Sequence, residues 1–303
     1  MSQVIGVDTD DVLFEDGTVI QPTRWAQRHY RLYLLLRTPS ALVGLFILLV
    51  LLVATIIGPR LAPYDPYYQN FLAELAPPSH AHLFGTDEYG RDIFSRVLYG
   101  VRSALAAGIV ANGIAMLVGA FIGLIAGYYG RWVDGLLMRT TDVMLAFPYL
   151  LLALIVVSIL GPGIESAVIA IGIVYAPQFA RLTRGSVLEA REHDYVDAAR
   201  ALGVSGPRMM WRHILPAVMP AVSVMATLTV GLAIVETAGL SFLGLGAQPP
   251  AADWGAMLAD GRNYMLSAQW VATFPGMAIL FTALGFNLLG DALRDVLDPR
   301  LVR

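Results

Sequence analysis

The stretch ALVGLFILLVLLVATII, residues 41–57, contains no charged residue and a single polar one, Thr55. A helix needs about 20 mostly apolar residues to cross the roughly 30 Å hydrocarbon core of a bilayer. Inside that core every backbone N–H and C=O needs an internal partner, which a helix supplies. The sequence therefore predicts a membrane-spanning helix over residues 40–58.

Five further apolar runs follow along the chain. They lie within residues 103–130, 143–164, 162–182, 214–236 and 263–290. The run within 162–182 is the weakest signal, because only 15 uncharged residues separate Glu165 from Arg181. The pattern predicts an all-α, polytopic membrane protein with six transmembrane helices.

The overall composition agrees with this class and excludes others. Of the 303 residues, 57% are hydrophobic and 14% are charged, whereas soluble domains carry about 25% charged residues. A soluble two-domain enzyme is therefore disfavoured, and a net charge of -3 gives no reason to expect nucleic acid as a partner. The absence of cysteine excludes disulfides, thiolate metal sites and cysteine nucleophiles.

All 20 basic residues are arginine. A phosphate-binding P-loop ends in a lysine that reaches the β- and γ-phosphates of a nucleotide. This chain has no lysine. If the protein uses ATP, another subunit must bind it.

The arginines also predict the orientation, because basic residues are retained on the cytoplasmic side of a membrane. With the N-terminus inside, 15 of the 20 arginines fall in cytoplasmic segments. The external segments keep Arg60, Arg91, Arg96, Arg102 and Arg262. Both termini are therefore predicted to be cytoplasmic.

This orientation divides the chain into five parts. A cytoplasmic tail, 1–39, is first acidic and then arginine-rich, and a transmembrane helix, 40–58, follows it. An external loop occupies 59–101, and a transmembrane domain occupies 102–294 with a cytoplasmic loop at 185–216. Residues 295–303 form a second cytoplasmic tail. The acidic residues of 1–20 are unlike the positive start of a secretory signal and are predicted to be a solvated tail; a role in binding a partner is the alternative.

The segment RGSVLEAREHDYVDAARALGVSGPRMMWRHILP, residues 184–216, contains two helix signals in series. Asp194 is placed to cap a first helix, with Asp197 near the positive end of its dipole. Gly203 supplies the permissive backbone that ends a helix. Ser205 then caps a second helix, with Pro207 in its first turn and Pro216 at its end. The segment is predicted to form a helix–glycine–helix elbow on the cytoplasmic face.

The small residues Ala198, Ala199, Ala201 and Gly203 would let the groove of another protein approach this elbow closely. The alternative is a solvated connector whose local ion pairs contribute about 0–1 kcal/mol each.

A family resemblance favours the docking interpretation. Asp197-Ala198-Ala199, then Gly203, then Leu215-Pro216 resembles the "EAA" loop of ABC importer permeases, with aspartate in place of glutamate and His213 in place of isoleucine. The resemblance implies that this loop forms a coupling helix seated in a groove of an ATPase subunit. The residues that it assigns to coupling are Asp194, Asp197, Ala198, Ala199, Arg200, Leu202, Gly203, Leu215 and Pro216.

Three other regions resemble the dipeptide and oligopeptide branch of that family, and the second permease subunit in particular. They are GTDEYGRD (85–92), LSFLGLGAQPP (240–250) with WGAML (254–258), and FNLLGDALRDVLDPRL (286–301). The resemblance extends over residues 32–301. It implies a type I ABC importer permease fold in a bacterial inner membrane. Nickel and glutathione importers share this branch.

The partners that the resemblance implies are a second homologous permease, two ATPase subunits that bind ATP and magnesium, and an external substrate-binding protein. The chain itself would bind no cofactor and catalyse no reaction. Its expected substrates are dipeptides or oligopeptides, with nickel chelates or glutathione as alternatives within the same type of complex.

Glu236 is the candidate pathway residue, because it lies at the outer end of the fifth apolar run. An ionisable group at such a position usually faces a bundle interior or an aqueous cavity. A packing carboxylate is the alternative. A stand-alone secondary transporter is a further hypothesis, but it would be expected to carry several charged residues within its spans or matched broken helices.

The remaining polar residues carry weaker signals. Asp142 is expected to form an interfacial ion pair near Arg139, and Gly119, Gly123 and Gly127 are expected to permit close helix packing. No histidine lies in an apolar run, which argues against an intramembrane Ser/His dyad. His80 and His82 are more easily explained as solvated side chains than as metal ligands.

Overall fold

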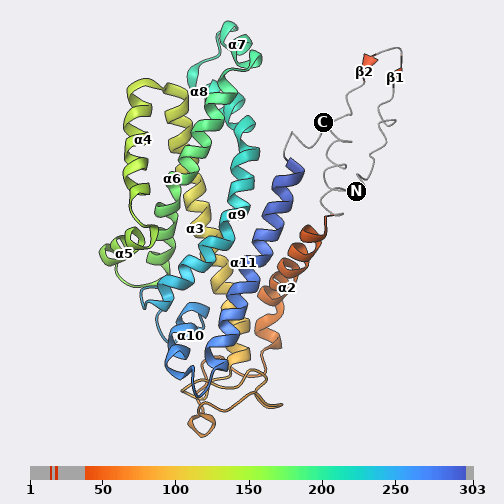
Figure 1. Ribbon diagram of the computed structural model, residues 1–303, viewed down its shortest axis with the longest axis vertical. Coiled ribbons are helices and arrows are strands. Elements are labelled where there is room, and N and C mark those ends of the chain that lie inside the picture. The colour runs from red at the N-terminus through yellow and green to blue at the C-terminus, as the bar shows by residue number, and fades with distance from the viewer. Residues whose placement is uncertain (1–13, 16–17, 20–37, 298–303) are drawn as a thin grey trace, which may run out of the picture.

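The computed structural model describes residues 14–15, 18–19 and 38–297 (Figure 1). Within them the fold is all-α apart from one antiparallel pair, β1 (Phe14–Glu15) and β2 (Thr18–Val19). The rest of the N-terminal tail and residues 298–303 lie outside the described residues. The main helices are α2 (Pro39–Leu61), α3 (Ile93–Tyr129), α4 (Arg131–Ala146), α5 (Tyr149–Leu160), α6 (Ile164–Arg191), α7 (Asp194–Ala201), α8 (Gly206–Met209), α9 (Leu215–Phe242), α10 (Trp254–Gly261) and α11 (Trp270–Leu297).

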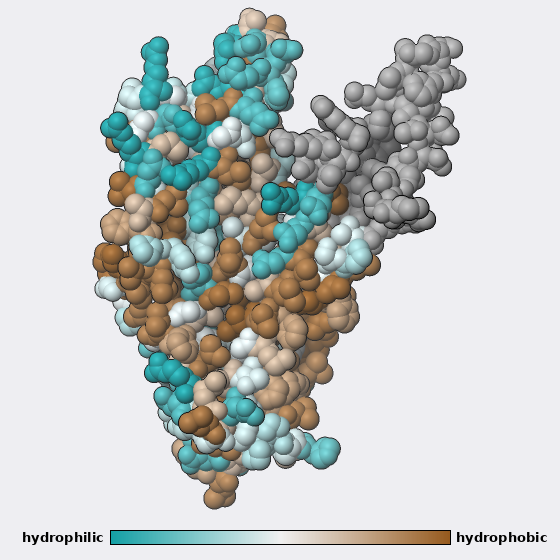
Figure 2. Space-filling model, viewed as in Figure 1, coloured by the Kyte–Doolittle hydropathy of each residue, from teal (hydrophilic) through white to brown (hydrophobic). Residues whose placement is uncertain are grey.

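Five helices are long and apolar enough to cross a membrane: α2, α3, α6, α11 and the continuous helix Gly206–Phe242, which contains α9. The bent pair α4 and α5 makes a sixth if it counts as one span. Figure 2 shows apolar side chains gathered across the middle of the molecule and hydrophilic ones near its two ends. The fold is therefore that of a polytopic helical membrane protein, as the sequence predicts.

The third predicted span is not a single helix, and here the expectation was wrong. The chain bends by 99° between α4 and α5. Phe147 has an extended backbone (φ -87°, ψ 141°) because the ring of Pro148 disfavours the helical conformation of the residue before it. The 12 residues of α5 extend only about 18 Å, which is less than the bilayer core.

The weakest predicted span, by contrast, is the most buried one. Helix α6 continues past Arg181 to Arg191, and 67% of its most apolar window is buried inside the protein. Two of its three arginines are accommodated because helix α4 supplies acidic partners. Arg184 donates to Asp134 at 2.6 Å, and Arg181 donates to Asp142 at 2.5 Å. Asp142 therefore pairs with Arg181 rather than with Arg139.

Helices α3 and α6 share the most extensive helix–helix contact in the described chain. A Cβ atom added to Gly119 would lie 2.3 Å from the carbonyl oxygen of Ala176, and one added to Gly123 would lie 2.4 Å from that of Ala180. At Gly127 it would meet the side chain of Val187 at 2.8 Å. The predicted structural role of these glycines is confirmed, since only glycine permits this approach.

The helices alternate in direction through the bundle (Figure 1). The start of α2, the α3–α4 turn, α7 and the end of α11 lie at one end, which we call the elbow end. The loop before α3 and helix α10 lie at the other end, which we call the loop end. The two ends of the described helical core therefore lie on the same side.

Candidate functional site

The elbow, which we define as residues 194–214, joins α6 to α9 at one extremity of the molecule. It consists of α7, a turn at 202–205, α8 and a π-helical turn, Met210–Ile214. Gly203 has φ +77°. Its N–H donates to the carbonyl oxygen of Arg200 at 3.0 Å, and the N–H of Val204 donates to the carbonyl oxygen of Ala199 at 3.1 Å. These two bonds form a Schellman motif, so the predicted helix–glycine–helix geometry is confirmed.

Apolar packing fixes the elbow to the bundle. Val196, Met209 and Ile214 are buried against Leu124 of α3 and Val187 of α6. Nearby, the Arg191 side chain donates to the carbonyl oxygens of Gly127 and Tyr128 at 2.8 and 3.0 Å. The elbow is thus attached to the three helices that form the centre of the bundle, α3, α6 and α9.

The outer surface of the elbow carries most of the residues that the sequence assigned to coupling. Asp194, Asp197, Ala198, Arg200, Leu202 and Gly203 are exposed. Asp197 and Arg200 form an ion pair at 2.7 Å. Leu202 is 85% exposed, although a leucine side chain gains free energy by leaving water. An exposed leucine on a turn that backbone hydrogen bonds hold in place is a candidate anchor for a partner.

Three details of the elbow differ from the expectations. Asp194 is the first residue of α7 rather than its cap; His193 precedes the helix, and its side chain makes no capping hydrogen bond. Ala199 is 7% exposed and packs into the underlying cluster, so its side chain is not available to a partner. Ser205 stands at the N-cap position of α8, also without a side-chain capping bond.

The second elbow helix does not end at Pro216, and this expectation was wrong as well. The helix runs on into α9, whose first turn contains Leu215 and Pro216. Proline has no N–H to donate, and its ring conflicts with the carbonyl group four residues earlier. A π turn directly precedes it, in which the N–H of Leu215 bonds to Met210. The widened turn accommodates the proline and connects the elbow directly to a membrane-spanning helix.

Glu236 lies inside α9, six residues before its end, and is half-buried. Its carboxylate lies within electrostatic reach of the hydroxyl groups of Tyr149, at the start of α5, and of Tyr175 on α6. Among the described residues it has no cationic partner. The structure thus places this carboxylate where α5, α6 and α9 meet, next to the bend in the third span.

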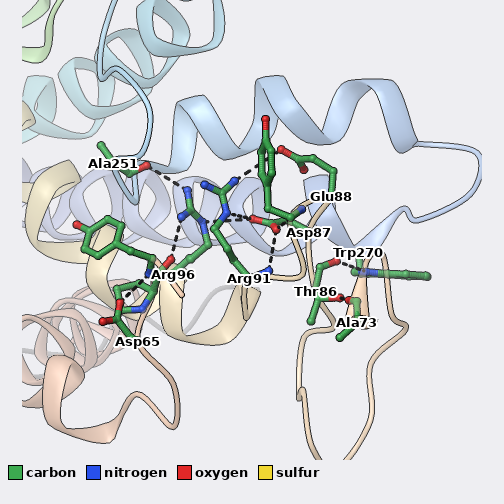
Figure 3. A network of polar contacts seen from close by, with 12 residues as sticks. Asp65, Ala73, Thr86, Asp87, Glu88, Arg91, Arg96, Ala251 and Trp270 are labelled. Atoms are coloured by element: carbon green, nitrogen blue, oxygen red, sulfur yellow. Dashed lines mark hydrogen bonds and ion pairs between the residues drawn. The ribbon is translucent and has the colours of Figure 1, made fainter. Parts of the chain in front are cut away.

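The loop end contains a polar network to which the sequence analysis assigned no role (Figure 3). Asp87 accepts hydrogen bonds from the backbone N–H of Arg91 at 2.9 Å and from its Nε at 2.6 Å. The guanidinium group of Arg96 donates to the carbonyl oxygens of Pro66 and Ala251 at 3.0 and 3.1 Å. These contacts fix the loop before α3 to the connection between α9 and α10.

Two tryptophan side chains and the N-cap residue of α3 complete this network. The indole N–H of Trp254 donates to the carbonyl oxygen of Val97 at 3.0 Å, and that of Trp270 donates to the carbonyl oxygen of Thr86 at 3.1 Å. Asp92 caps α3 by accepting from the N–H of Ser95 at 2.8 Å, and it also bonds to His82 at 2.9 Å. His82 is therefore an ordered part of the network rather than a solvated side chain. The signal that could have predicted the network is the run of charged residues directly before an apolar helix, since buried charges need partners.

Burial shifts the titration of several groups here. It raises the pKa of Glu88, Asp253 and Asp260. Arg91 and Arg96 are among the residues that line a cavity of about 330 Å³. Within the described part of the chain, no group of three or more His, Asp or Glu side chains could hold a metal ion.

Comparison with protein families matches two parts of the chain. Residues 119–303 match the family described as binding-protein-dependent transport system inner membrane component. Residues 29–78 match the N-terminal transmembrane domain of oligopeptide transport permease C.

Curated relatives cover nearly the whole chain. The dipeptide transport system permease protein DppC of Alkalihalophilus pseudofirmus is 45% identical over 284 residues, which is 94% of this chain and 92% of that protein. The probable D,D-dipeptide transport system permease protein DdpC of Escherichia coli is 42% identical over 291 residues, or 95% and 98% of the two chains. The glutathione transport system permease protein GsiD of Pectobacterium atrosepticum is 47% identical over 259 residues, or 85% and 86%.

This similarity spans both the elbow and the membrane helices. The chain therefore belongs to the family of binding-protein-dependent transport system inner membrane components, the multi-pass, non-catalytic permease subunits of ABC importers.

Proposed function

We propose that this chain forms half of the transmembrane pathway of an ATP-driven importer of dipeptides or oligopeptides and that its elbow couples the pathway to ATPase subunits. One observation carries the coupling role: the elbow presents Leu202, 85% exposed, on a turn fixed to the three central helices. A leucine so placed would fill an apolar pocket on a partner and remove its surface from water.

The distribution of arginine supports a cytoplasmic elbow. Nine arginines of the described chain lie in or beside the elbow end, whereas five lie toward the loop end. Basic residues are retained on the cytoplasmic side. The ATPase subunits, with their ATP and magnesium, would thus meet the elbow in the cytoplasm, and an external binding protein would meet the loop end.

The connections of the elbow suggest how movement reaches the pathway. Its α8 end is continuous with α9, and its α7 end follows α6 after two residues. When ATP closes the ATPase dimer, displacement of the elbow would tilt α6 and α9 relative to a second homologous permease. The pathway would then open outward to receive substrate from the binding protein, and hydrolysis would reset it.

Glu236 is the residue that we place on this pathway. It is a half-buried carboxylate without a cationic partner among the described residues, and such groups in membrane helices usually face an aqueous cavity. The part of α9 near its loop end that carries it, together with the start of α5, would line the route.

Peptides are the substrate class that the relatives favour, because two of the three described above are named for dipeptide transport. Glutathione, which is itself a peptide, is an alternative supported by the name of the third. Nickel chelates remain an alternative within the same type of complex. Binding assays of the external binding protein with peptides, glutathione and nickel chelates would decide among these substrates.

The coupling role is tested by Leu202→Asp in the complete complex of both permeases, the ATPases and the binding protein. If Leu202 is a central anchor, its loss costs about 2 kcal/mol, so the affinity for the ATPase subunits is expected to fall about 30-fold, which co-purification would measure. Gly203→Arg, which strains the turn at φ +77°, should also uncouple the complex. Ala199→Glu is unsuitable, because it would disrupt the packing beneath the elbow.

Leu266→Asp is the matched control, because Leu266 is fully exposed in the connection between α10 and α11, far along the chain from the elbow. It should leave ATPase binding unchanged. Normal ATPase binding and peptide-stimulated hydrolysis in Leu202→Asp would refute the coupling role. A chain that purifies without any ATPase, even from cells that produce the whole complex, would instead favour a stand-alone secondary transporter.

A further inference from the structure

We propose that a groove between α3 and α9 binds one acyl chain of an anionic phospholipid, with the lipid phosphate held by Arg208 and Arg212. The groove has a volume of about 430 Å³. Its lining is apolar and consists of Met116, Leu117, Val118, Ala120, Phe121 and Leu124 on α3 and Trp211, Leu215, Met219 and Val222 on the facing helix.

The groove opens on the outer surface of the chain. Leu117 is 67% exposed, and Phe121 and Trp211 are 53% and 55% exposed. In a bilayer these side chains contact either lipid or another protein. The length of the groove distinguishes the two.

The groove is only about one leaflet deep. From Trp211 to Val222 the helix rises by about 16 Å, roughly half of the 30 Å hydrocarbon core. A transmembrane helix of a second subunit would need contact across the full thickness. A lipid tail extends through one leaflet, and its length fits the groove.

Aromatic side chains mark the head-group level at the elbow end. Trp211, Tyr129 and Trp132 are 55%, 53% and 76% exposed, and tryptophan and tyrosine gather at membrane–water interfaces. The groove therefore begins at the level of the lipid head groups and leads into the apolar layer.

Charge complementarity selects an anionic head group. Arg208 and Arg212 are exposed, and neither forms an ion pair with any residue that the structure describes. They precede Trp211 and Leu215 by three residues, the spacing that places helix residues on one side. The segment 203–214 contains no acidic residue. Basic pockets between transmembrane helices are known head-group sites, and guanidinium groups bind phosphate through paired hydrogen bonds.

The test is native mass spectrometry of the complete importer with added phosphatidylglycerol or phosphatidylcholine. We expect preferential retention of phosphatidylglycerol. Each arginine near the membrane surface contributes about fivefold in lipid affinity, so Arg208→Gln with Arg212→Gln should weaken retention about 30-fold. The control is Arg131→Gln with Arg139→Gln, which removes the same charge from exposed positions at the same end. The proposal would be overturned if both double variants lost phosphatidylglycerol equally, or if the variant at Arg208 and Arg212 retained it as well as the wild type.

A second measurement does not depend on the arginine variants folding. The chain has no cysteine, so Phe121→Cys provides a unique attachment point for a fluorophore within the groove. Phosphatidylglycerol with brominated chains should quench this fluorophore more strongly than brominated phosphatidylcholine does. Efficient cross-linking of the same cysteine to the second permease, without lipid quenching, would show that a protein occupies the groove.

Discussion

Glu88 illustrates at the scale of one residue how the loop-end network responds to pH. Its side chain is 13% exposed, one of its oxygens has no hydrogen-bond partner among the described residues, and Arg91 lies 3.6 Å away. Burial, with a smaller contribution from Asp87, raises the pKa of Glu88 above its ordinary value of 4.5. The folded chain therefore holds this proton more tightly than the unfolded chain. The resulting stability is present below the ordinary pKa and is lost as pH rises through the folded-state value.

Glu88→Gln should consequently stabilise the protein at pH 8, because it keeps the size of the side chain and removes the buried charge. We expect a higher Tm than wild type at pH 8, by about 2–4 °C for each kcal/mol gained, and no difference near pH 4. Thermal unfolding across this pH range is the measurement. Glu74→Gln, at an exposed carboxylate of the same loop, should show no such pH-dependent gap. A lower Tm for Glu88→Gln at pH 8 would mean that attraction to Arg91 outweighs the cost of burial.

At the scale of the elements, the contact between α3 and α6 sets the architecture of the bundle. Gly119, Gly123 and Gly127 let the two backbones approach so closely that a methyl group at Gly123 would lie 2.4 Å from a carbonyl oxygen. Van der Waals packing is the main attraction between helices in lipid, where no hydrophobic effect drives them together. Close contact along this seam is therefore a principal source of stability.

Gly123→Ala tests this contact, and Gly113 on the same helix provides the control. Overpacking at Gly123 should lower the free energy of unfolding by about 1–3 kcal/mol. At Gly113 an added Cβ meets nothing within 4 Å. Gly113→Ala should therefore be neutral or stabilise the helix by up to about 1 kcal/mol. Denaturant unfolding in mild detergent would compare the two. Equal stability of both variants would contradict the assignment of this seam.

At the scale of the whole molecule, the elbow end and the loop end separate the two functional surfaces. The elbow end carries the turn that we propose as the docking site, and the loop end carries the polar network and its cavity. The proposed orientation places the first in the cytoplasm and the second outside.

Single cysteines test this orientation without background labelling, since the chain contains none. Ser205→Cys in the elbow and Ser267→Cys near the loop end are both at exposed positions. In cells whose outer membrane is made permeable and whose inner membrane is intact, a membrane-impermeant maleimide should label Ser267→Cys and not Ser205→Cys. The permeable reagent should label both. The reverse pattern would overturn the orientation and, with it, the cytoplasmic docking of the ATPases.

Local sequence pattern was sufficient for the features that depend on local forces. Apolar runs predicted α2, α3, α9 and α11, because burial in a bilayer rewards any long uncharged helix. Gly203 predicted the turn of the elbow, because a residue with positive φ is needed there. The family motifs predicted the coupling loop, which stays a prediction, and the comparisons confirmed the family.

The tertiary structure alone decided which faces are buried and which charges are paired. The arginines of α6 made that span look short, yet Asp134 and Asp142 of α4 neutralise them across a contact that no local pattern encodes. Ala198 and Ala199 are indistinguishable by composition, but packing against α3 and α6 buries the second and leaves the first exposed. The sequence by itself determined the class of protein and the site of the elbow, because hydrophobicity and backbone preference are local properties. The bend of the third span, the exposed face of the elbow and the loop-end network needed the fold, because pairing energies depend on residues that are distant along the chain.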